Sequence, residues 1–142
     1  MSSMAVIYWS GTGNTLEMAE AVVAGAKEAG IDAELFAVNK ITVEAASQYD
    51  LLALGCPSMG DEVLEETTFE PFFIGLEHHI QGKKVALFGS YGWGDGQWMR
   101  DWQQRVLKGG ATLINDAGLI CNGHPSADGL AACRALAVAL IG

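Results

Sequence analysis

The stretch that decides the fold covers residues 4–30 and reads MAVIYWSGTGNTLEMAEAVVAGAKEAG. It opens with five apolar or aromatic residues at 4–8, which is typical of a buried strand. A turn rich in glycine, serine and threonine follows, and apolar side chains then recur at helical spacing over residues 14–29, up to Gly30. The stretch therefore predicts a strand, a tight turn and a helix, which together are the first half of a βαβ unit.

The alternation of strand-like and helical segments continues beyond this stretch. Further strands are expected at residues 33–38, 51–56, 85–89 and 111–121, with Asn115 and Asp116 marking a bulge in the last of them. Further helices are expected at residues 43–48, 69–79, 96–108 and 127–141, the last of them capped by Ser126. Five βα units in succession predict an α/β fold with a doubly wound, five-stranded parallel sheet, because right-handed crossovers leave few other arrangements. The strand order 2-1-3-4-5 is favoured.

Length and hydrophobic content predict a single globular domain over residues 1–142. The chain has 142 residues, of which 50% are hydrophobic, so it can bury a core without disulfides or metals. No apolar run approaches the roughly 20 residues of a membrane span. The first residues, Met1, Ser2 and Ser3, show none of the charged and apolar regions of a signal peptide. We therefore expect a cytoplasmic monomer.

The net charge narrows the range of expected partners, and the cysteines indicate the redox compartment. The chain carries 17 Asp and Glu against 8 Lys and Arg, a net charge of -9. A nucleic acid or an anionic membrane would be repelled, so neither is expected as a partner, whereas a basic protein surface would be attracted. The three cysteines, at 56, 121 and 133, form no CxxC motif, which indicates reduced thiols in a reducing compartment.

The first loop has the composition of a phosphate-binding turn. It offers hydroxyls, free backbone N–H groups and a helix amino end in six consecutive residues, Ser10, Gly11, Thr12, Gly13, Asn14 and Thr15. It contains no GK[ST], which excludes the Lys and Mg²⁺ chemistry of a P-loop NTPase, and Leu16 replaces the third glycine of GxGxxG. Residues 36–39 hold no acidic side chain for an adenosine ribose, which disfavours NAD. A monophosphate held by neutral donors fits best.

Two further loops carry large apolar side chains that their neighbours cannot bury. Trp93 lies between Gly92 and Gly94, which offer it no side chains to pack against. An indole in such a loop suits stacking on a flat aromatic ligand. Met59, in the loop after the third strand, can cover the opposite face of that ligand. The two platforms together favour a binding site over ordinary core packing.

Three runs of sequence resemble the flavodoxins, and more narrowly the short-chain flavodoxins of anaerobic bacteria. They are YWSGTGNT at 8–15, GCPSMGDE at 55–62 and LFGSYGWGDGQWM at 87–99. The similarity extends over essentially the whole chain, and the fifth strand is expected to be uninterrupted, without the insertion of long-chain relatives. The resemblance implies one non-covalently bound FMN and a role in electron transfer.

The resemblance also assigns roles to individual residues. The loop at 10–15 would hold the FMN phosphate, Met59 and Trp93 would flank the ring, and Glu62 would accept a hydrogen bond from the flavin N3–H. Gly60 would turn its peptide so that the carbonyl accepts from the reduced ring, which requires backbone angles that a Cβ penalises. Asn122 would approach the ribityl chain. The full set of expected FMN contacts is Ser10, Gly11, Thr12, Gly13, Asn14, Thr15, Pro57, Ser58, Met59, Gly60, Asp61, Glu62, Ser90, Tyr91, Gly92, Trp93, Gly94 and Asn122.

The function implied is that of a low-potential one-electron carrier rather than an enzyme. It would shuttle between semiquinone and hydroquinone while it serves larger redox enzymes with basic patches, of the kind that otherwise use ferredoxin. The alternative is an FMN-dependent NAD(P)H:quinone reductase or nitroreductase, against which the short chain and the scarcity of Arg and Lys count. A third class, a phospho-receiver module, would need clustered aspartates after the first strand and an aspartate at the end of the third, where this chain has Trp9-Ser10 and Cys56-Pro57.

Charge near the ring should make the second electron harder to add. The fully reduced flavin is anionic, and five carboxylates lie in or beside the loops: Asp61, Glu62, Glu65, Glu66 and Asp95.

Trp98 and Trp102 are expected to pack in the core or on the surface. Cys56 is expected to be a small buried hydrophobe, and no metal site is expected from the three histidines.

Overall fold

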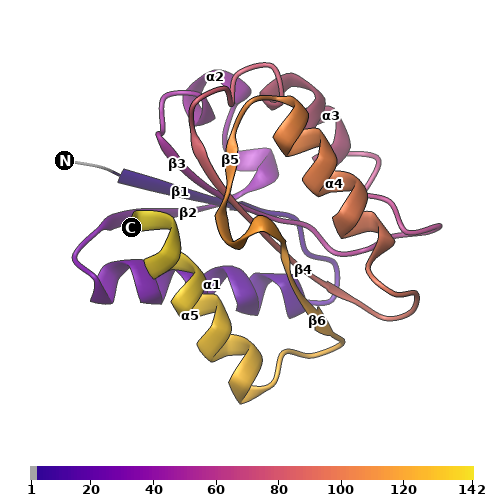
Figure 1. The fold of residues 1–142 in the computed structure, drawn as a ribbon. Coiled ribbons are helices and arrows are strands. Elements are labelled where there is room, and N and C mark those ends of the chain that lie inside the picture. The colour runs from indigo at the N-terminus through magenta and orange to yellow at the C-terminus, as the bar shows by residue number, and fades with distance from the viewer. Residues whose placement is uncertain (1–2) are drawn as a thin grey trace.

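A computed structural model describes residues 3–142 of the chain (Figure 1). The strands are Ser3–Tyr8 (β1), Asp32–Ala37 (β2), Leu51–Gly55 (β3), Lys84–Tyr91 (β4), Thr112–Leu113 (β5) and Leu119–Asn122 (β6). The helices are Asn14–Glu28 (α1), Val43–Ala46 (α2), Phe69–Leu76 (α3), Gln97–Lys108 (α4) and Ala127–Ile141 (α5), with short 3-10 turns at Val38–Lys40 (η1) and Ile114–Asp116 (η2). Met1 and Ser2, where the sequence predicts no signal peptide, lie outside the described residues.

The strands form one parallel sheet in the order β2-β1-β3-β4-β5, with β6 also paired to β4. This confirms the predicted doubly wound arrangement. Helices α1 and α5 cover one face, and α2, α3 and α4 cover the other (Figure 1). Tyr8 is in register with Gly55, and Gly55 with Phe88, so the loops after β1, β3 and β4 emerge at the same edge of the sheet.

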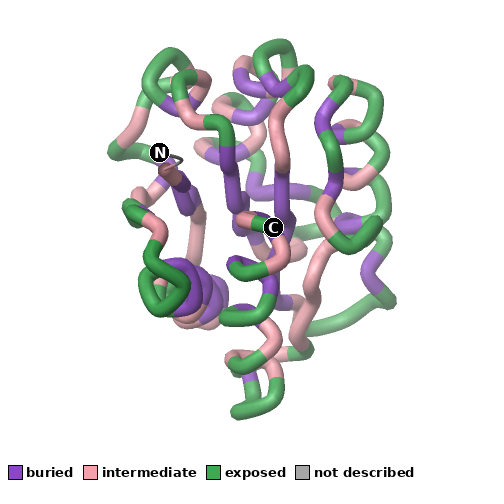
Figure 2. Tube along the Cα trace, turned by 60° about the vertical axis from the view of Figure 1, so that its left-hand side comes forward, coloured by how far each residue is buried: buried purple, intermediate pink, exposed green. Residues whose placement is uncertain are grey.

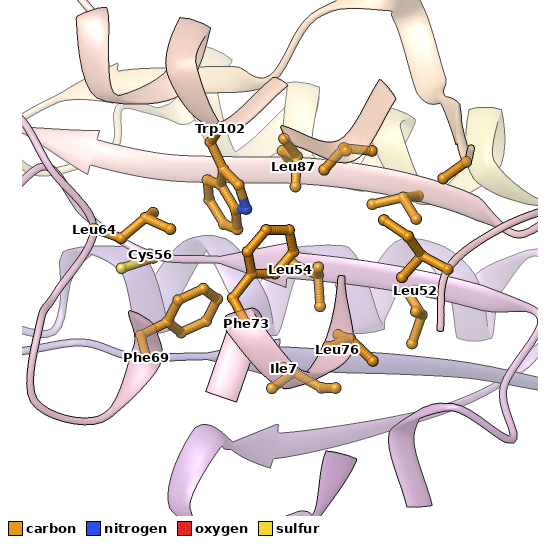
Figure 3. Close-up of a cluster of buried hydrophobic side chains, with 14 of the residues drawn as sticks. Ile7, Leu52, Leu54, Cys56, Leu64, Phe69, Phe73, Leu76, Leu87 and Trp102 are labelled. Carbon is orange, nitrogen blue, oxygen red and sulfur yellow. The ribbon is translucent and has the colours of Figure 1, made fainter. Parts of the chain in front are cut away.

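The core consists of two apolar layers, one on each face of the sheet, and Figure 2 shows the buried strands between helices with exposed outer sides. On the α3 and α4 side, the Trp102 ring packs edge-on against Phe69 and Phe73, with centroids 5.4 and 5.9 Å apart (Figure 3). Trp98 and Trp102 are each 1% exposed, so of the two expected places, core or surface, both occupy the core. On the other face, α1 and α5 approach so closely that a Cβ at Gly25 would lie 2.3 Å from the Arg134 carbonyl oxygen.

The prediction of an uninterrupted fifth strand is wrong. The segment runs as β5, then the turn η2, then β6, and both strands pair with β4. Asn115 and Asp116 have φ values of 63° and 58°, which lie in the left-handed region and outside the range of a strand. Asparagine and aspartate tolerate this conformation better than other non-glycine residues. The irregularity therefore falls where the sequence placed it, but it breaks the strand.

The helix predictions hold with shorter bounds for two helices. The segments expected at 43–48 and 69–79 end as helices at Ala46 and Leu76. Ser126 caps α5 as predicted, because its Oγ accepts a hydrogen bond from the Gly129 N–H at 3.1 Å. Within residues 3–142, none of the helices combines the length and the hydropathy needed to cross a bilayer.

Candidate functional site

An open cleft lies at the edge of the sheet where the carboxyl ends of β1, β3 and β4 meet. Its volume of about 230 Å³ is small beside the roughly 300–1,000 Å³ of sites that enclose their ligands. A ligand larger than the cleft would therefore keep one side in solvent. The cleft is lined by Trp9, Ser10, Gly11, Thr12, Asn14, Thr15, Pro57, Ser58, Met59, Ser90, Tyr91, Gly92 and Gly123, none of which is charged.

The first loop presents unpaired donors to this cleft. Gly13 is the N-cap of α1 with φ 97°, and α1 receives no side-chain cap from it. The Gly13 N–H donates to Ser10 Oγ at 3.1 Å, which closes the loop on itself and leaves the Ser10 hydroxyl proton free to donate. Thr15 is 1% exposed and its Oγ1 lies 3.4 Å from Ser90 Oγ, so it joins α1 to β4. The loop thus has the donors and the helix amino end that an anion-binding turn requires.

The second loop, which follows β3, is held by backbone hydrogen bonds at its base, whereas its tip is open to solvent. The backbone groups of Met59 and Val63 exchange two hydrogen bonds, at 2.9 and 3.0 Å. Between them Gly60 and Glu62 have φ values of 50° and 56°. The space beside Gly60 is open, so its backbone angle and not crowding is what favours glycine there. The Ser58 N–H donates to the Ser90 carbonyl at 3.0 Å and joins this loop to β4.

The third loop exposes its tryptophan. The Trp93 side chain lies among exposed neighbours, and the residue is 62% exposed, the largest exposed fraction of any large hydrophobic residue described. Tyr91 and Gly92 line the cleft, whereas Trp93 and Gly94 do not. Trp93 is therefore accessible at the rim, beside the cleft rather than in it.

Two of the residues that line the cleft were not predicted from the sequence. Trp9 follows β1 directly, and its ring covers Gly11, where an added Cβ would lie 3.1 Å from it. Gly123 enters the lining because its N–H donates to the Tyr91 carbonyl at 2.8 Å. Adjacency to the phosphate loop was a signal for Trp9, but the direction of its side chain is set by tertiary packing. The expected contacts that lie outside the lining are Gly13, Gly60, Asp61, Glu62, Trp93, Gly94 and Asn122.

Comparison with known proteins agrees with this geometry. The family model described as flavodoxin matches residues 6–135. A flavodoxin from Clostridium beijerinckii is 48% identical over 122 residues, which are 86% of this chain and 88% of that protein. A flavodoxin from Megasphaera elsdenii is 49% identical over 112 residues, which are 79% and 82% of the two chains. This chain belongs to the flavodoxin family.

The structural comparison gives the same family. The solution structure of the two-electron reduced Megasphaera elsdenii flavodoxin superposes with a TM-score of 0.85 at 43% identity, covering 96% of this chain and 97% of that one. As a flavodoxin the protein binds FMN and transfers electrons, and it is not an enzyme. The residues present fit FMN, because the uncapped end of α1 and neutral hydroxyls face a cleft that Trp9, Met59 and Tyr91 also line.

The Glu62 carboxylate of this flavodoxin is directed to the amino end of α4. Its Oε1 accepts from the backbone N–H groups of Gly96 and Gln97, at 3.2 and 2.9 Å. These are the first donors of a helix whose N-cap, Gly96, supplies no side chain. The second loop and the third loop are therefore held together by one carboxylate.

Glu65 is a structural residue and does not belong among the exposed charges near the ring. It is 5% exposed and its carboxylate accepts from the backbone N–H groups of Thr68 and Phe69, at 2.8 and 2.7 Å, where α3 begins. It also accepts from the Thr67 hydroxyl and N–H. Burial by itself raises the pKa of the Glu65 carboxyl, but these hydrogen bonds outweigh it and hold the pKa below its ordinary value.

The charge of Asp95 is also partly compensated. Its Oδ1 lies 2.8 Å from Arg100 Nη2 in an ion pair between exposed side chains. The sequence indicates Asp95 only as one of five carboxylates in or beside the loops, and the ion pair with Arg100 is visible only in the structure. Asp95 precedes α4 and Arg100 lies near its start, and the folded chain brings the two side chains together. The uncompensated carboxylates of the loops are therefore fewer than the sequence suggested.

Cys56 behaves as predicted. It is fully buried at the end of β3, and burial raises the pKa of its thiol. A thiol that stays protonated is a poor nucleophile. Within residues 3–142, no group of three His, Cys, Asp or Glu side chains is placed to hold a metal ion.

Proposed function

We propose that this flavodoxin is a low-potential one-electron carrier that cycles its FMN between semiquinone and hydroquinone and serves larger redox enzymes. The observation that carries the proposal is the uncharged, open cleft, which joins an anion-binding turn to an apolar wall and leaves one side in solvent. An exposed cofactor edge suits transfer of single electrons by contact with a partner. It offers little enclosure for a bound organic substrate.

The phosphate of FMN would be held by the first loop. Ser10 and Thr12 offer hydroxyls, and the N-cap of α1, Gly13, provides no side chain to cap the first N–H groups of the helix. No Lys or Arg lines the cleft, so binding would rest on hydrogen bonds and on the helix amino end.

The flavin ring would lie between Met59 and Trp93. Met59 lines the cleft and is 37% exposed, while the exposed Trp93 lies at the rim with a free indole face. Both side chains would lose solvent contact on binding, and that burial supplies the driving force. Glu62 would accept a hydrogen bond from the ring N3–H.

The Gly60 peptide would turn to favour the half-reduced state. The Met59–Val63 bridge fixes both ends of the turn, so a change at Gly60 need not disturb the rest of the loop. One hydrogen bond of about 1 kcal/mol net to the half-reduced ring would raise the first potential by roughly 40 mV.

The remaining loop charges would lower the second potential. Asp61 and Glu66 are exposed, and Glu62 is partly exposed. At ~10 Å and an effective dielectric of ~40, each like charge costs the anionic ring about 0.8 kcal/mol, so three would lower the potential by roughly 100 mV at low salt. The same charges would steer the cofactor rim toward basic patches on partner enzymes, of the kind that otherwise use ferredoxin.

Anaerobic reductive titration of the FMN-loaded protein, followed by visible absorbance, tests the proposal. The expected result is a blue neutral semiquinone at half reduction and a second step at lower potential. Direct two-electron bleaching would contradict it. The reductase alternative is not favoured, because no charged side chain lines the cleft to hold the phosphates of NAD(P)H. Steady NAD(P)H oxidation by the protein alone would reverse that ranking.

A further inference from the structure

Glu62 caps a helix that lies more than thirty residues further along the chain. Its Oε1 takes both hydrogen bonds from the Gly96 and Gln97 N–H groups, and among the described residues no donor contacts Oε2. The amino-terminal N–H groups of a helix have no partner within the helix. A carboxylate there is also favoured by the helix dipole. One oxygen of Glu62 is therefore held in place, and the other is available as an acceptor.

The position of this carboxylate depends on the absence of a side chain at Gly94. A Cβ built on Gly94 would lie 2.4 Å from Glu62 Cδ, and 2.6 and 2.7 Å from its two oxygens. At separations under 3.0 Å something must shift, and here the group that can shift is the carboxylate, because it is the end of a flexible side chain. The carboxylate therefore occupies the space that any residue other than glycine at 94 would claim.

The backbone of Glu62 is constrained as well. Its φ of 56° is unusual for a residue with a side chain. The Met59–Val63 bridge closes the turn on either side of it. The turn therefore fixes the backbone of Glu62. The amino end of α4 and the space left by Gly94 fix the position of its carboxylate.

We propose that Gly94 is a positioning residue: it leaves room for the Glu62 carboxylate against the amino end of α4, where Oε1 is held and Oε2 stays available to accept a hydrogen bond from the flavin ring. The inference rests on the proposed role of Glu62 in FMN binding. Gly94 would then act through Glu62 and not by touching the cofactor.

A double-mutant cycle separates the positioning of the Glu62 carboxylate by Gly94 from the backbone strain that a substitution at position 94 causes. Gly94 has φ 85°, so Gly94→Ala is strained whatever surrounds it, and Gly30→Ala supplies the matched control, with φ 82° and no atom within 4 Å of an added Cβ. The FMN dissociation constant is measured by quenching of flavin fluorescence for the wild type, Gly94→Ala, Glu62→Ala and the double variant. Gly94→Ala should raise it at least tenfold in the wild-type background and less than threefold in the Glu62→Ala background. Gly30→Ala should change it less than twofold.

The outcomes distinguish the inference from the function on which it rests. Equal effects of Gly94→Ala in both backgrounds would show strain alone and overturn the positioning role, while the role of Glu62 stands. Unchanged FMN binding by Glu62→Ala would overturn the role of Glu62 itself, and the inference with it. If Gly94 acts through Glu62, Gly94→Ala should also shift the first midpoint potential in the same direction as Glu62→Ala.

Glu62→Asp provides a second test that adds no atom at position 94. The shorter side chain withdraws the carboxylate from α4. Amide exchange of Gly96 and Gln97, measured by NMR on the FMN-saturated protein, should become at least tenfold faster. The Gly129 amide, which Ser126 caps, should be unaffected. Unchanged protection of Gly96 and Gln97 would overturn the inference.

Discussion

The indole Nε1 of Trp98 donates a hydrogen bond to the Cys56 carbonyl oxygen at 3.0 Å. This contact fastens α4 to the carboxyl end of β3, the point at which the second loop begins. Gly89 lies so close by that a Cβ there would approach the same carbonyl oxygen to 2.2 Å. The spacing between the second and third loops is therefore set beneath the cleft, in the core, rather than by the loops themselves.

Trp98→Phe should destabilise the protein by about 1–3 kcal/mol more than Trp102→Phe, because the first change leaves a buried carbonyl without its donor. Trp102 is the matched control, since it is equally buried and its Nε1 has no hydrogen-bond partner in the described structure. Urea unfolding of the FMN-saturated variants measures the difference. Equal losses would mean that ring packing and not the hydrogen bond fastens α4.

Glu65→Gln should lower the free energy of unfolding by about 2 kcal/mol at neutral pH, because an amide cannot replace the charged acceptor at the start of α3. The folded-state pKa of Glu65 is lowered. Its contribution is therefore complete above the unfolded pKa of about 4.3 and is lost as the pH falls through the folded-state value.

Denaturant unfolding at a series of pH values should show the wild type and Glu65→Gln converging below about pH 4. Glu66→Gln, at the exposed neighbouring position, should stay within about 0.5 kcal/mol of the wild type. A difference between the wild type and Glu65→Gln that does not vary with pH would rule out the ionised cap.

Ser10→Ala should weaken FMN binding by roughly 10- to 100-fold, since a hydrogen bond to a charged group contributes about 1.5–3 kcal/mol. The binding of riboflavin, which lacks the phosphate, should change less than about threefold. Fluorescence titrations with the two ligands make the comparison, and Thr42→Ala, at the cap of α2, serves as a control remote from the cleft. Equal weakening of both ligands would place Ser10 at the ring rather than at the phosphate.

Asp61→Asn should raise the midpoint potential of the second one-electron step by about 35 mV at low salt, because one like charge near the anionic ring is removed. The effect should shrink as salt is added. Asp50→Asn is the control, since Asp50 precedes β3 at the opposite edge of the sheet. Spectroelectrochemical titration measures both, and an equal shift from Asp50→Asn would show that net charge and not position sets the potential.

Local sequence determined much of this architecture. The strand, turn and helix at residues 4–30 follow from hydrophobic periodicity and from a run of glycine and hydroxyl residues, which act within a few residues of each other. Parallel strands in succession then bring the loops at 10–15, 57–62 and 90–94 to one edge, since crossover connections return each strand in the same direction. The place of the cleft was therefore predictable.

Contacts between distant segments decided the rest. Asn115 and Asp116 marked an irregularity, but only the packed structure shows that it breaks the strand. Glu62 and Glu65 both appeared as loop charges; the structure directs Glu62 to α4 and buries Glu65 at the start of α3. The side-chain direction of Trp9 also depends on packing. Periodicity and spacing describe a residue's surroundings along the chain, whereas hydrogen-bond partners and burial depend on segments that only the folded chain brings together.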